Sequence, residues 1–170
     1  DTTVGVTLEQ LAPYLALHER NAESLVAAYC LTKNEALLRE ALERFPDDPS
    51  VLETAYTELK GADRLALAQR LAEVSPDNGF GPRLAAGLLL DAGDREGAMA
   101  SLLEAGTRHE VADHGVARGT AMREALLACG FGSAEATLGS LWSNPIIPIY
   151  WVNVATKELG ERTKQALDEG

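Results

Sequence analysis

Between residues 21 and 108 the chain repeats one pattern, in which two short apolar stripes at helical spacing are each followed by a turn. The turn Pro-Asp-Asp at 46–48 recurs 30 residues later as Pro-Asp-Asn at 76–78. The polar residues expected to begin the second helix of each pair are spaced 29 and 31 residues apart: Asn34, Asp63 and Asp94. Two short amphipathic helices cannot bury their own apolar faces, so successive pairs must stack. The repeat therefore predicts an all-α fold, a right-handed α-α superhelix of three helix pairs, although a plain helical bundle with loops at similar intervals fits the same pattern.

The segments on either side of the repeat are also predicted to be helical, within a single domain of 170 residues. Thr7 and Gln10 have the spacing of a capping box, which opens a helix over about residues 8–19. Pro13 either kinks this helix or delays its start. The expected organisation is an N-terminal helix over 1–20, three helix pairs over 21–108 and a helical C-terminal cap over 109–170.

The C-terminal section is expected to cover the last apolar face of the superhelix. Residues 112–129 predict a longer helix that ends at Gly130, and another helix runs from Ser133 through Trp142. A neighbouring helix can approach the first of these closely where Gly115 and Gly119 lie one turn apart. The chain after the prolines at 145 and 148 fits a helical face, but its β-branched cluster leaves a short extended segment over 145–154 open.

The composition places the chain among globular proteins and excludes several classes of partner. Apolar residues make up 46% and charged residues 24%, and 15 Lys and Arg stand against 26 Asp and Glu, for a net charge of −11. Nucleic acids and anionic membranes need a basic face, so neither is an expected partner, whereas a basic or helical protein segment is. The longest strongly apolar run, Leu84–Leu90, is too short to insert into a membrane. We expect a soluble acidic domain, the processed or excised part of a longer or exported protein, whose compartment the sequence leaves open.

The third helix pair resembles the tetratricopeptide repeat (TPR) family. Ala86 and Gly87 stand where that family places a small residue on its first helix, and the turn at 93–94 has its Gly-Asp. The second helix has the family's small–large–small series, which is Ala98, Leu102 and Ala105. The resemblance extends over residues 21–108, but the first two copies are shorter than the usual repeat of about 34 residues and lack its tryptophan.

The resemblance implies a non-catalytic scaffold that binds a protein or peptide partner on a concave face lined by the first helix of each pair. By this analogy the partner-binding groove contains Leu52, Tyr56, Lys60, Phe80, Arg83 and Leu90. The Lys, Arg and Asn clamp by which known members hold a terminal carboxylate is not supported, because Arg83 is the only cation at a matching position and Gly87 replaces the asparagine.

A second hypothesis is a structural module that associates with copies of itself, as a homo-oligomer, through the apolar C-terminal region. Trp142, Ile147 and Trp151 are the residues expected to form that contact. Cys30 and Cys129 lie in apolar helical stretches and are expected to behave as small buried side chains, although a disulfide between them stays open.

A third hypothesis, a metal-dependent hydrolase, rests on residues 109–114. On a helix His109 and Asp113 would share a face and be close enough to ligate one metal. His114 comes one residue too late for the zinc-protease spacing, a rotation of about 100° around the helix. A polar helix start explains the same residues, because carboxylates are favoured near a helix N-terminus. The sequence has no phosphate-binding glycine loop and no nucleophile elbow, so we expect no cofactor and no enzymatic activity.

Overall fold

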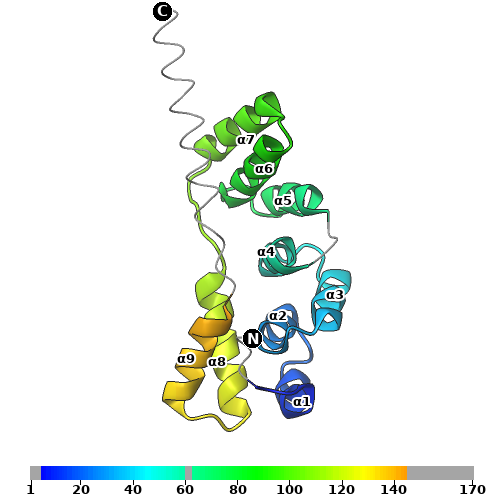
Figure 1. Ribbon diagram of the computed structural model, residues 1–170, viewed down its shortest axis with the longest axis vertical. Helices are drawn as coiled ribbons and strands as arrows, with labels where there is room; N and C mark the ends of the chain where they lie inside the picture. Colours follow the sequence, from blue (N-terminus) through cyan, green and yellow to red (C-terminus); the bar gives the residue numbers. More distant parts are fainter. Residues whose placement is uncertain (1–4, 60–62, 145–170) are drawn as a thin grey trace, which may run out of the picture. The chain divides into compact units, whose positions relative to one another are not determined.

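The computed structural model describes residues 5–59 and 63–144, and these ranges confirm the predicted all-α class. They contain nine helices and no strand (Figure 1). The helices are α1 (Leu8–Leu17), α2 (Ala22–Thr32), α3 (Glu35–Arg44), α4 (Pro49–Glu58), α5 (Arg64–Val74), α6 (Phe80–Asp91), α7 (Arg95–Thr107), α8 (Gly115–Ala128) and α9 (Ser133–Ser143). The six helices expected over residues 21–108 are therefore present as α2 to α7.

Side-chain caps explain where several helices begin. The predicted capping box of α1 is confirmed, since the Thr7 hydroxyl accepts from the Gln10 N–H at 3.3 Å and the Gln10 side chain accepts from the Thr7 N–H at 2.9 Å. Asn34 and Asp94 cap α3 and α7 as predicted. Pro13 lies inside α1, so the alternative of a delayed start is wrong.

The chain divides into two compact units, and unit 1 combines α1 to α4 with α8 and α9. Helix α2 lies at its centre, because eight successive residues, 24–31, are buried. Helices α1, α3, α4 and α8 all pack against α2, and α9 packs on α8 (Figure 1). A helix that is apolar all round needs such a complete shell of neighbours. The Tyr14 hydroxyl, which donates to the Ala121 carbonyl at 3.3 Å, adds a bond between α1 and α8.

Unit 2 contains α5, α6 and α7, packed in order along the chain. Gly81 allows α6 to approach α5 closely, because a Cβ atom there would lie 2.6 Å from the Ala72 nitrogen. The Arg108 guanidinium lies at the end of α5 and donates to four carbonyl oxygens, those of Ala72, Ser75, Pro76 and Asn78. Free carbonyls at a helix C-terminus need partners of this kind.

The segment before α8 is not helical, which corrects the prediction of a helix from residue 112. The Asn78 side chain accepts from the Ala112 N–H and donates to the Ala112 carbonyl, and residues 78 and 110 form an isolated parallel bridge. These bonds hold the backbone of 110–112 extended, so α8 begins only at Gly115.

The alternatives for residues 145–154 lie outside the described residues. Within the described ranges, none of the helices has the length and apolar character that crossing a membrane requires.

Candidate partner-binding surfaces

The residues predicted to line a groove lie in different parts of the structure. Leu52 and Tyr56, on α4 of unit 1, are buried in the interior rather than open to solvent. On α6 of unit 2, Arg83 is exposed, and Phe80 and Leu90 are partly exposed. Lys60 lies outside the described residues. Within unit 1 the predicted positions therefore belong to the core.

Unit 1 contains a buried ion pair that the sequence reasoning missed. Glu53, on α4, and Arg118, on α8, each have 1% of the side chain exposed, and the guanidinium donates to the carboxylate at 3.1 Å. Arg118 also donates to the Thr54 hydroxyl at 3.4 Å. Glu53 and Arg118 each stand among the buried residues of a helix that are mostly apolar. A charged residue at such a position was the signal that could have revealed the pair. Burying a charge is costly unless it is paired and hydrogen-bonded, so these groups depend on each other.

His114 and Asn144 complete the cluster around this ion pair. The second carboxylate oxygen of Glu53 accepts from the His114 backbone N–H at 3.1 Å and lies 3.0 Å from the His114 ring nitrogen Nδ1. The Asn144 carbonyl oxygen accepts from Arg118 Nε at 2.8 Å, and its amide donates to the Gly115 carbonyl at 2.7 Å. One carboxylate thus joins α4 to the first turn of α8, and Asn144 joins that turn to the end of α9.

The cluster shifts the pKa values of its titratable members in opposite directions. Burial by itself would raise the pKa of Glu53, but the hydrogen bonds from His114 and the charge of Arg118 outweigh burial and lower it. The hydrogen bond to Glu53 raises the pKa of His114 against the opposing effect of burial, and the carboxylate of Asp48 adds to the rise. The charged forms of both groups are therefore favoured.

Helix α9 has an exposed apolar face. Its buried residues, which face α8, are Ala136, Gly139, Ser140 and Ser143. On the opposite side of the helix Leu138, Leu141 and Trp142 are 59%, 65% and 71% exposed. The prediction that Trp142 belongs to an apolar contact region stays untested, and Ile147 and Trp151 lie outside the described residues. Leu138 and Leu141 were missed, although Leu138 lies one helical turn before both Leu141 and Trp142, and this spacing was the available signal.

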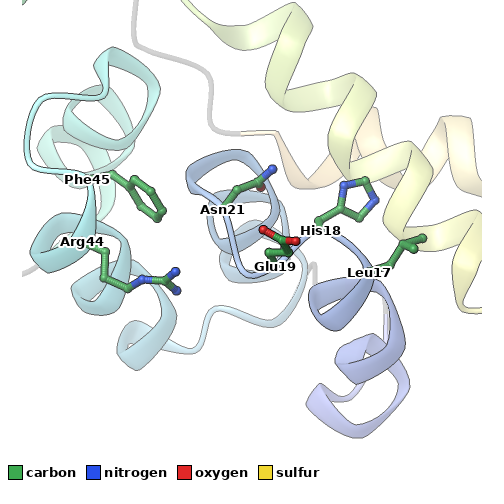
Figure 2. Close-up of a pocket in the computed structure, with 6 residues that line it drawn as sticks. All are labelled: Leu17, His18, Glu19, Asn21, Arg44 and Phe45. Carbon is green, nitrogen blue, oxygen red and sulfur yellow. The ribbon is translucent and has the colours of Figure 1, made fainter.

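A shallow pocket of about 500 Å³ lies in unit 1 between the end of α1, the start of α2 and the end of α3 (Figure 2). It is lined by Leu17, His18, Glu19, Asn21, Arg44 and Phe45. Two of its polar side chains already serve the fold: Asn21 caps α2, and Arg44 donates to the Arg20 carbonyl and to Glu40. The pocket therefore presents few free groups to a ligand.

The residues considered for a metal site do not share a helix. His109 and Asp113 lie in the non-helical segment before α8, so the prediction that they share a helical face is wrong. His114 instead contacts Glu53. The described residues contain no group of three His, Cys, Asp or Glu side chains arranged to hold a metal ion.

Both cysteines are free thiols in unit 1. Cys30 is buried as expected, and burial raises its pKa to about 12. Cys129 is only partly buried, and its sulfur contacts the Gln10 carbonyl at 3.4 Å.

No family model matches this chain, and neither a curated protein nor a solved structure matches it.

Proposed function

We propose that this chain is a non-catalytic helical scaffold, similar to TPR proteins, that acts by joining protein chains through helix surfaces. Sequential stacking supports this proposal. In unit 1, α2 packs on α3, α3 on α4, and α2 also on α4, while in unit 2 α5 packs on α6 and α6 on α7. The right-handed superhelix expected from the sequence is proposed for each of these stacked sets of helices.

The outward face of α9 is the observation that carries the proposal. Exposed apolar side chains that lie next to one another mark a contact site more often than single scattered ones do. Leu138, Leu141 and Trp142 form two turns of such a surface, on the side of α9 that faces away from α8. By contrast, the predicted groove positions of unit 1 are already buried.

The partner that fits this face best is a second copy of the chain. Glu135 is the only charged residue of α9, and its carboxylate turns back to accept from the Gly132 N–H. For a protein of net charge −11, self-association needs a contact that brings few carboxylates together, and this face provides one. Two copies related by a twofold axis would place the same apolar stripe on both sides. Three side chains make a small contact, so we propose a weak, concentration-dependent homodimer.

Sedimentation equilibrium of the whole chain over a wide concentration range tests this assembly role. We expect the average mass to rise from one chain toward two, and Trp142→Glu to keep the mass at one chain at every concentration. Val116→Glu is the matched control, because Val116 is also an exposed apolar residue, at 85%, but lies on α8 outside the stripe. A wild-type mass that stays at one chain, or an equal effect of the two substitutions, contradicts the proposed dimer.

A second candidate is partner binding at α6, where Arg83 is exposed at a predicted groove position. Its test is affinity capture with the wild type and Arg83→Glu at a concentration where the chain is monomeric. We expect Arg83→Glu to lose a protein that the wild type and Trp142→Glu retain. Identical sets of captured proteins contradict this candidate.

A further inference from the structure

The inner surface of unit 1 is made by α1 and α2, with Glu53 and Thr54 of α4 at one end, and it is covered by a helix from far along the chain. Residues 24–31 of α2 are buried on all sides, and α8 provides part of that cover (Figure 1). The residues joined by the Glu53–Arg118 ion pair are 65 positions apart. Helix α8 therefore lies on this surface as a ligand would, although it belongs to the same chain.

The contact face of α8 has the pattern of an amphipathic ligand helix. Its buried residues are Arg118, Ala121, Met122, Ala125 and Leu126, which recur at helical spacing on one side. Four are apolar and small or flexible, and one is a cation at the end nearest the helix start. Helices that bind in grooves present such regularly spaced anchors.

The surface that α8 covers has polar groups that bind the Arg118 guanidinium. The Glu53 carboxylate accepts from Arg118 at 3.1 Å and the Thr54 hydroxyl is 3.4 Å from the same nitrogen, so two neighbouring residues of α4 contact one guanidinium. A buried ion pair adds little stability compared with apolar packing, but it penalises a wrong partner strongly, because an unpaired charge would stay buried. Glu53 therefore contributes more to the choice of the helix that binds here than to the free energy of unfolding.

We propose that the surface formed by α1 and α2, with Glu53 and Thr54 of α4 at one end, is a binding site for an amphipathic helix that presents an arginine to Glu53, and that α8 is its resident occupant. A partner helix with the spacing of Arg118, Ala121, Met122, Ala125 and Leu126 competes with α8 for this site. The proposal does not rest on the outward face of α9, since it concerns the buried residues of α8.

Competition between the resident helix and added peptides tests the site in the whole chain. The probes are fluorescent peptides of residues 114–128, one with the natural sequence and one with Arg118→Gln. The receiving chain is Arg118→Gln, in which the resident helix has lost the cation. Fluorescence anisotropy should show the natural peptide binding this chain at least about tenfold more tightly than the substituted peptide, because only the natural peptide can pair with Glu53.

Adding Glu53→Gln to the receiving chain provides the control. The two peptides should then bind within about twofold of each other, because the carboxylate that distinguishes them is gone. Circular dichroism establishes that each receiving chain is folded. If Arg118→Gln is unfolded, Met122→Ala takes its place, since it weakens the apolar contact of α8 and leaves Glu53 intact. Failure of the natural peptide to bind a folded receiving chain, or equal binding of both peptides to a chain that has Glu53, overturns the proposal.

Discussion

Glu53 differs from the exposed carboxylates of unit 1 because its charge is paired in the interior. The exposed pair of Glu35 and Arg39, at 3.2 Å, lies on one face of α3 in high dielectric, where such pairs contribute about 0.5 kcal/mol or less. Glu53 is buried with Arg118, and both of its oxygens accept hydrogen bonds from α8. One residue of α4 thus holds the first turn of another helix.

The contact of Glu53 with His114 predicts a pH-dependent stability. The pKa of His114 is raised in the folded chain, so its contribution is complete below the ordinary histidine pKa of about 6.5 and is lost as pH rises through the raised value. The pKa of Glu53 is lowered, so its contribution is present above the ordinary glutamate pKa of about 4.3 and is lost as pH falls through the lowered value. Between these limits both contributions are present.

Urea unfolding of the wild type and His114→Gln at several pH values measures this effect. We expect the free energy of unfolding of the wild type to exceed that of the variant by the largest margin near pH 5.5 and by a smaller margin near pH 8.5. In a Glu53→Gln background the difference should depend less on pH, because only the carboxylate of Asp48 still favours the charged form of His114. A wild-type advantage that grows toward pH 8.5 would contradict the assigned His114–Glu53 contact.

The individual helices were largely predictable from local signals. The caps at Thr7, Asn34 and Asp94 each act within three residues, and sequence shows such neighbours directly. The segment before α8 was not predictable, because Asn78 determines its conformation from 34 residues away. The role of Gly81 in the close approach of α6 to α5 was not predictable either, because it depends on how these two helices pack.

Two glycine substitutions in unit 2 separate close packing from helix propensity. Gly81→Ala should destabilise the chain by about 1–3 kcal/mol, because the new Cβ would lie 2.6 Å from the Ala72 nitrogen and 2.9 Å from the Ala68 carbonyl oxygen. Gly106→Ala, on α7, should stabilise it by up to about 1 kcal/mol, because no atom lies within 4 Å of the new Cβ. Urea unfolding followed by circular dichroism measures both, and a stabilising Gly81→Ala would refute the close approach of α6 to α5.

At the scale of the whole molecule, unit 1 is assembled from two stretches of chain that are far apart in sequence. Helices α1 to α4 come from the first part, and α8 and α9 come from residues beyond 112. The prediction of a single helical domain did not anticipate this division, because stripes of apolar residues indicate that a helix needs a neighbour but not which neighbour it finds.

Leu126→Ala tests the discontinuous unit. Leu126 is fully buried on α8, so truncation should cost about 2–5 kcal/mol through lost apolar contact and the cavity left behind. Native-state hydrogen exchange should show reduced protection in α1, α2 and α9 as well as α8, while α5 to α7 keep their wild-type protection. Reduced protection confined to α8 would contradict the packing of α8 on α2.

The amino-acid sequence alone determined the helical class, most helix positions and several caps, because these depend on apolar spacing and on polar groups a few residues away. The assignment of Trp142 to an apolar contact region stays a prediction. Only the tertiary structure decided that α8 covers α2, that Glu53 meets Arg118 and His114, and that the apolar face of α9 stays exposed. The first two outcomes depend on contacts between segments more than 60 residues apart, where many pairings satisfy the same local pattern and the choice is made by packing and by the pairing of buried charge.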